Sequence, residues 1–121
     1  MTFWVWAGVA LLGGISALAR FGVDAVFGSH AGRAFPYGTL AVNASASFLL
    51  GLVTGLALTG DALLLAGTAT IGSYSTFSTW ILETHRLAED GETGAAAVNL
   101  VVSVGVGVGA AAIGRLIGTG L

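Results

Sequence analysis

Hydrophobic and polar positions divide the chain into four long apolar stretches joined by short polar connections. About 20 apolar residues span the hydrocarbon core of a bilayer, so stretches of this length predict membrane-spanning helices. The predicted spans are residues 3–27, 36–60, 62–82 and 94–114. Because the connections leave no room for a soluble domain, we expect residues 1–121 to form a single membrane domain with both termini on the same side.

Local signals support these boundaries. Pro36 suits the first turn of a helix, where its missing N–H is not needed. The third connection is predicted to be a hydrophilic loop because it gathers the charged and titratable residues Glu83, His85, Arg86, Glu89, Asp90 and Glu92. The first stretch has no basic n-region and no convincing cleavage site, so we expect a membrane helix there rather than a signal peptide.

Composition excludes a water-soluble globule, because 55% of the residues are hydrophobic and only 8% are charged. Cysteine is absent, which excludes disulfides and Cys-ligated metals. The four basic residues are scattered single arginines, which excludes a basic patch for nucleic acid. We therefore expect an all-α, multi-pass protein of the cell membrane with no nucleic-acid partner.

The arginines set only a weak orientation. Arg20, Arg33 and Arg86 flank the first and third connections, and Arg115 lies on the side of the termini. Positive residues favour the cytoplasmic side, so three against one weakly favours cytoplasmic first and third connections. A chain with so little bias can insert in either orientation.

Glycine accounts for 20 of the 121 residues. Pairs spaced four residues apart occur at Gly51 and Gly55, Gly105 and Gly109, and Gly114 and Gly118. Such pairs favour close packing of membrane helices, either within one chain or between chains.

The third apolar stretch carries an unusual density of hydroxyl groups. Six hydroxyls stand in the seven residues from Ser73 to Thr79, directly after Gly72. Ser and Thr can bond back to their own helix, but this run also has low helix propensity and predicts a break near Gly72 to Thr76. Carbonyls freed by a break are natural ligands for a hard cation such as sodium.

Single polar residues in the other stretches are open to two interpretations. The Asn43 amide can make an interhelical hydrogen bond or line a pore. Arg20 can extend to the interface or draw anions toward a vestibule. Asn99 and Ser103 are four residues apart and share one helix face.

The absence of central carboxylates in the spans argues against a proton-coupled small-molecule exporter. The chain offers no combination of residues for a catalytic metal or a Ser-His-Asp triad, so we do not expect an enzyme. Hydroxyl and amide donors, together with Phe77 and Trp80 three residues apart, point instead to an anion path.

The sequence resembles the Fluc (CrcB) family of fluoride channels over nearly its whole length. The similarity lies at residues 13–21 (GGISALARF), 36–51 (PYGTLAVNASASFLLG) and 72–83 (GSYSTFSTWILE), and more loosely at 99–114. This resemblance implies a passive, fluoride-selective channel that lowers cytoplasmic fluoride. It also implies an antiparallel, dual-topology dimer of four-helix subunits with a broken third helix.

The resemblance further implies roles for single residues. The implied fluoride pore comprises Asn43, Phe77, Ser78, Thr79 and Trp80. Arg20 matches the first-span arginine of the family, and Glu83 matches the acid after the aromatic motif. A structural sodium ion at the dimer centre would be held by the carbonyls of Gly72 and Ser75. Asn99 and Ser103 are further candidates on the fourth span.

Several positions depart from the family pattern. Trp80 stands where Phe is usual, Ser75 where Thr is typical, and Asn99 in the place of a Tyr; Ser73 and Ala46 replace glycines. Two altered pore positions leave open that the chain is one half of a heterodimer with a diverged, oppositely oriented paralogue. A non-conducting assembly subunit is another alternative.

Overall fold

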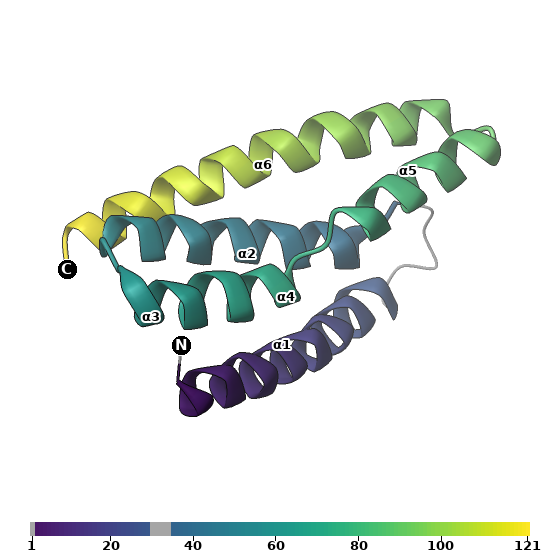
Figure 1. The fold of residues 1–121 in the computed structure, drawn as a ribbon. Coiled ribbons are helices and arrows are strands. Elements are labelled where there is room, and N and C mark those ends of the chain that lie inside the picture. Colours follow the sequence, from purple (N-terminus) through teal and green to yellow (C-terminus); the bar gives the residue numbers. More distant parts are fainter. Residues whose placement is uncertain (1, 30–34) are drawn as a thin grey trace.

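The computed structural model describes residues 2–29 and 35–121. The described residues form helices joined by short turns (Figure 1). The elements are α1 (Phe3–Ser29), α2 (Tyr37–Gly55), α3 (Gly60–Leu63), the π-helix η1 (Leu64–Ile71), α4 (Gly72–Tyr74), α5 (Ser78–Glu89) and α6 (Thr93–Thr119). In this part of the chain, α1, α2 and α6 are long and apolar enough to cross a membrane, and they correspond to the first, second and fourth predicted spans.

Three predicted boundaries were wrong. The second span was expected to reach residue 60, but α2 ends at Gly55 and a turn at residues 56–59 follows, in which Ala57 has a φ of 56°. Gly60, with a φ of 60°, begins α3. The fourth span was expected to end at residue 114, but α6 continues to Thr119. The predicted hydrophilic loop is largely helical, because α5 continues to Glu89. Its end is marked by Gly91, whose φ of 81° suits glycine and lets the next N–H, that of Glu92, bond back to the Leu87 carbonyl at 2.8 Å. Part of the predicted first connection, residues 30–34, lies outside the described residues.

The third apolar stretch is not one regular helix. It passes through α3, η1 and α4, leaves helical geometry at Ser75, and resumes as α5 from Ser78. The interruption therefore falls at residues 75–77, at the end of the window 72–76 in which the sequence predicted it. In Figure 1 the series from α3 to α5 runs from the end of the molecule that holds both termini to the opposite end.

Helices α2 and α6 form the most extensive contact in the described structure and lie side by side in Figure 1. Glycines allow their backbones to meet. A Cβ added at Gly51 would strike the backbone carbonyl of Ala111, and one added at Gly114 would strike that of Phe48. Gly55 and Gly118 also face each other across this contact. Two of the three predicted glycine pairs thus pack within the chain, whereas Gly105 and Gly109 face open space.

Buried side chains are few and small. Val42 is fully buried, and Ala46, Val53 and Ile71 form a cluster between α2 and η1. By contrast, α1 carries large exposed apolar side chains at Leu11, Ile15 and Leu18. An apolar outer face is what a helix needs for contact with lipid or with another membrane helix.

The α2–α6 contact generates a prediction about stability. Gly51→Ala should lower the free energy of unfolding by about 1–3 kcal/mol, because the added methyl overpacks a backbone contact. The matched control is Gly22→Ala in the interior of α1, whose methyl enters open space and whose helix propensity improves. Unfolding in mixed micelles, followed by helical circular dichroism during titration with sodium dodecyl sulfate, measures both. Equal losses in the two variants would contradict the packing described here.

Candidate functional site

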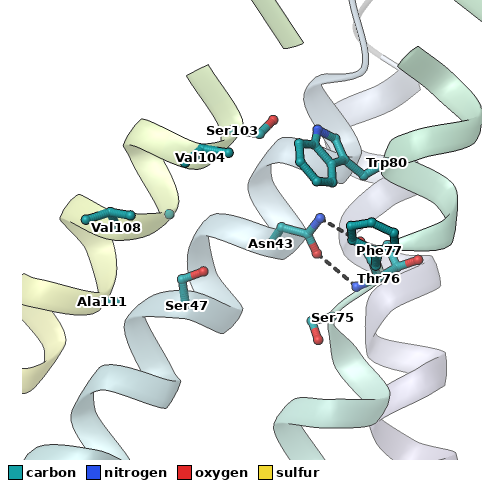
Figure 2. Close-up of a pocket in the computed structure, with 11 residues that line it drawn as sticks. Asn43, Ser47, Ser75, Thr76, Phe77, Trp80, Ser103, Val104, Val108 and Ala111 are labelled. Atoms are coloured by element: carbon teal, nitrogen blue, oxygen red, sulfur yellow. Dashed lines mark hydrogen bonds between the residues drawn. The ribbon is translucent and has the colours of Figure 1, made fainter. Parts of the chain in front are cut away.

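Asn43 of α2 holds the interruption between α4 and α5 in place. Its Nδ2 donates a hydrogen bond to the Thr76 carbonyl at 2.7 Å, and its Oδ1 accepts one from the Thr76 N–H at 2.9 Å. One amide therefore satisfies both backbone groups of a residue that has left the helix (Figure 2). Irregular backbone at membrane depth requires such pairing. Of the two roles considered for Asn43, the interhelical hydrogen bond is thus present.

The same pairing frees a carbonyl at Gly72. In a continuous α-helix the Thr76 N–H would bond to the carbonyl four residues earlier, but it donates to Asn43 instead. The next carbonyl of interest, that of Ser75, accepts a hydrogen bond from Arg20 Nη1 at 3.3 Å. Arg20 of α1 therefore contacts the break directly. Of the two residues predicted as sodium ligands, Ser75 begins the break and shares its carbonyl with a guanidinium, whereas Gly72 is the first residue of α4, just before the break, and has a freed carbonyl.

A cavity of about 460 Å³ lies beside the break. Its walls come from α2, from residues 75–77, from α5 and from one face of α6 (Figure 2). The lining residues are Asn43, Ser47, Ser75, Thr76, Phe77, Trp80, Ser103, Val104, Gly107, Val108 and Ala111. The structure thus brings three of the five predicted pore residues together in one cavity, and it adds Ser103 from α6.

The two aromatic residues form one wall of the cavity. The ring centroids of Phe77 and Trp80 are 5.6 Å apart and their planes are inclined by 72°, an edge-to-face arrangement. Phe77 is 70% exposed although it lines the cavity, so the cavity is open on this side of the chain. Edge-to-face packing directs the weakly positive rim of one ring toward the negative face of the other.

Three side chains supply polar atoms from the helices opposite. Nδ2 of Asn43 carries two N–H groups, of which the Thr76 carbonyl uses one. The hydroxyls of Ser47 and Ser103 come from α2 and α6. Among the described lining residues there is no carboxylate and no basic side chain. The cavity therefore combines neutral hydrogen-bond donors with aromatic rings.

Asn99 does not line the cavity, although it is a neighbour of residues that do. Its side chain is buried, with 1% exposure, and its Nδ2 donates to Thr84 Oγ1 of α5 at 2.7 Å. Its Oδ1 accepts from Ser103 Oγ at 3.3 Å, which confirms that these two residues share a helix face. Its backbone carbonyl accepts from Trp80 Nε1 at 3.3 Å. Asn99 thus joins α6 to α5 behind the aromatic wall.

The remaining predicted site residues lie apart from the cavity lining. Ser78 is exposed at the start of α5. Thr79 is half-buried, and its N–H donates to Thr76 Oγ1 at 3.2 Å. Glu83, one turn further along α5, accepts a hydrogen bond from the buried Thr39 hydroxyl of α2. Within one chain, these three residues are not brought together with Phe77 and Trp80.

Sequence reasoning missed part of the cavity wall. Ser47 follows Asn43 by four residues, and this spacing alone indicates that both lie on one face of α2. On α6, Ser103, Gly107 and Ala111 repeat the same spacing. Gly107 leaves room for Ser47, because a Cβ there would lie 3.4 Å from the Ser47 hydroxyl oxygen. The sequence signal was a row of small residues on one helix face, and such a row is also expected where helices simply pack closely.

Comparison with known proteins extends over nearly the whole chain. The chain is 55% identical over 111 residues to the fluoride-specific ion channel FluC 2 of Mycolicibacterium paratuberculosis, covering 92% of this chain and 91% of that protein. It is 51% identical over 117 residues to FluC 2 of Mycobacterium tuberculosis, covering 97% and 93%. It is 43% identical over 123 residues to FluC 1 of Symbiobacterium thermophilum, covering 97% and 98%.

A protein family described as "CrcB-like protein, Camphor Resistance (CrcB)" matches residues 7–115, which include the break, the aromatic pair and most of α6. The resemblance noted from the sequence motifs and the identity to these relatives therefore agree. On this evidence the chain belongs to the CrcB family.

Proposed function

We propose that this chain is a subunit of a passive, fluoride-selective channel of the cell membrane, through which fluoride leaves the cytoplasm. The observation that carries the proposal is the cavity beside the broken helix, lined by neutral donors and by the Phe77–Trp80 pair. It occurs in a chain whose relatives bear the name fluoride-specific ion channel.

The chemistry of the cavity suits a small, strongly hydrated anion. An N–H of Asn43 and the hydroxyl of Ser47 would replace part of the hydration shell of fluoride, whereas the Ser103 hydroxyl gives its hydrogen to Asn99 Oδ1. The aromatic rims add weak positive potential without a fixed charge. A cationic side chain in the lining would bind the anion too tightly for rapid release, since conduction requires binding that also permits exit.

Passive flow is sufficient to lower fluoride in the cytoplasm. A membrane potential that is negative inside drives an anion outward with about 2.3 kcal/mol per elementary charge for each 100 mV. No coupling proton is then needed. The proton-coupled exporter finds no support in the cavity, because its described lining lacks a carboxylate.

The number of membrane spans and the assembly of the subunits are part of this proposal. The α3–α5 series would form a third crossing of the membrane between α2 and α6, giving four spans. Two such subunits would assemble antiparallel, which the weak arginine bias permits. Support comes from the open side of the cavity, where Phe77 is 70% exposed, and from Gly105 and Gly109, where an added Cβ would meet no other described part of the chain within 4 Å.

A structural sodium ion at the dimer centre fits the residues present. The Gly72 carbonyl is freed by Asn43, and the Ser75 carbonyl keeps a second lone pair beside its bond to Arg20. Two carbonyls cannot replace the hydration shell of a cation, so the equivalent pair of the second subunit would complete the site. Bound there, sodium would supply a fixed positive charge that holds the two breaks together.

A heterodimer is the second candidate. The relatives bear the numbers FluC 1 and FluC 2, which fits the presence of more than one such chain in an organism. Trp80 and Asn99, which both depart from the family pattern, are joined by a hydrogen bond in this chain. The chain would then need a diverged partner to conduct.

Reconstitution of this chain alone in liposomes tests the proposal. Fluoride efflux, recorded with an electrode and with chloride as the control anion, should be fast and selective. Phe77→Ile should abolish efflux and change the free energy of unfolding by less than about 0.5 kcal/mol, because the ring is exposed in the single chain.

The matched control is Phe3→Ile, which replaces a similarly exposed phenylalanine at the far end of α1. Unchanged efflux in Phe77→Ile would exclude this ring from the path. Silence from folded wild-type protein, followed by efflux when a FluC 1-type chain is added, would establish the heterodimer instead.

Asn43 should affect folding as well as conduction. Asn43→Leu leaves the half-buried Thr76 N–H and carbonyl without their partner, so we expect a loss of about 1–3 kcal/mol in the free energy of unfolding. Thr54→Val on the same helix removes a hydroxyl that bonds to its own helix at the Leu50 carbonyl and should cost less than about 1 kcal/mol. Titration with sodium dodecyl sulfate measures the free energy of unfolding of both variants. A neutral Asn43→Leu would show that the break does not depend on this amide.

Sodium can be removed without changing the chain. Purification in N-methyl-D-glucamine in place of sodium should reduce the dimer fraction, measured by cross-linking in liposomes, and abolish fluoride efflux. Both should return when sodium is restored, with potassium at equal concentration as the control. Full efflux after exhaustive removal of sodium would exclude the ion from the working channel.

A further inference from the structure

We propose that Thr84 and Asn99 form a positioning pair that fixes the indole ring of Trp80 in the cavity wall. The inference deepens the proposed function, since Trp80 matters for conduction only if the cavity is the fluoride path. It concerns residues behind the wall, which do not touch the cavity themselves.

Three hydrogen bonds close a ring through these residues. Trp80 Nε1 donates to the Asn99 carbonyl at 3.3 Å, and Asn99 Nδ2 donates to Thr84 Oγ1 at 2.7 Å. Thr84 Oγ1 in turn donates to the Trp80 carbonyl at 2.9 Å, one turn back along α5. Because the Thr84 hydroxyl gives its only hydrogen to this carbonyl, it must accept from Asn99, which assigns the orientation of the amide.

Burial makes the ring of bonds obligatory. Asn99 is 1% exposed, so neither water nor lipid can substitute for its partners. Its Oδ1 is also used, by the Ser103 hydroxyl at 3.3 Å. An amide left without partners at this position would be strongly unfavourable, and the arrangement therefore holds α5 and α6 at one relative rotation.

The consequence for Trp80 is a fixed ring. Its backbone carbonyl accepts from Thr84, and its indole N–H donates to Asn99. Its ring packs edge-to-face with Phe77, with the ring centroids 5.6 Å apart, and Figure 2 shows these two side chains next to each other. The N–H is directed to the protein rather than to the cavity. Trp80 therefore presents carbon atoms to the path, as a phenylalanine would, and its larger ring is prevented from turning its donor toward the anion.

Exchange of the Trp80 indole hydrogen tests the positioning directly. We would label the tryptophans of the full chain with nitrogen-15 in lipid nanodiscs, with Trp4 and Trp6 as internal references. Thr84→Val should speed exchange at Trp80 about tenfold, whereas Thr84→Ser should stay near the wild-type rate because it keeps the hydroxyl.

The matched control is Thr54→Val. Thr54 makes the same type of bond to the carbonyl four residues earlier, at 2.8 Å, on the exposed side of α2. It should leave exchange at Trp80 unchanged. If Thr84→Val itself stays close to the wild-type rate, the positioning pair is overturned.

Fluoride efflux in single and double mutants distinguishes loss of Trp80 positioning from a general loss of structure. Thr84→Val should slow fluoride efflux about fivefold or more in the wild-type background but have little effect in Trp80→Phe, which has no indole N–H to hold. Equal slowing in both backgrounds would mean a merely structural role and overturn the proposal. If the wild type conducts no fluoride either alone or with a FluC 1-type chain, the proposed function fails, and the exchange rates alone decide on the positioning pair.

Discussion

The paired hydrogen bonds between the Asn43 amide and the Thr76 backbone are the constraint on which the site depends. Backbone that leaves a helix in apolar surroundings exposes groups that are strongly unfavourable when unpaired. A single side chain of α2 meets both, so the chain can end α4 at Tyr74 and begin α5 at Ser78. This short departure exposes Phe77, frees a carbonyl and opens the cavity. Asn43 can act in this way only because α2 is itself fixed against α6 by backbone contacts at glycines.

Two amide side chains, one buried and one half-buried, connect different helices of the site. Asn43 ties α2 to the break, and Asn99 ties α6 to α5. Of the aromatic pair, Trp80 bonds to Asn99, and Phe77 directly follows Thr76, whose backbone Asn43 pairs. Most of these polar groups satisfy the backbone or each other, while Asn43 and Ser47 also line the cavity.

The sequence predicts those parts of the molecule that depend on local composition. The existence and position of α1, α2 and α6 follow from apolar runs, although the ends of α2 and α6 differ from the prediction by five residues each, and the break follows from the hydroxyl-rich segment after Gly72. The helical continuation of α5 was missed because charges at Glu83, Arg86 and Glu89 suggested a loop, although Gly91 marked the true end. The direction of the Asn99 amide could not be predicted, since it depends on how α5 is rotated against α6. Ser78 and Thr79 were implied only by the family resemblance, and neither lines the cavity of the single chain.

The π-helix η1 bears on which insertions and deletions the chain tolerates, a property that composition does not record. Its wider turns show in Thr70, whose hydroxyl reaches the Leu65 carbonyl five residues earlier. Each π-helical bond encloses one residue more than an α-helical bond, so a single deletion within η1 can be absorbed by a return to α-helical bonding. A deletion within α4 cannot be absorbed in this way. It would rotate the following residues by about 100°, which would swing the Ser75 carbonyl away from Arg20 and carry Thr76 away from Asn43. Length changes among relatives of this chain should accordingly accumulate in the turns, at residues 56–59 and 90–92, and avoid α4, which leads into the break.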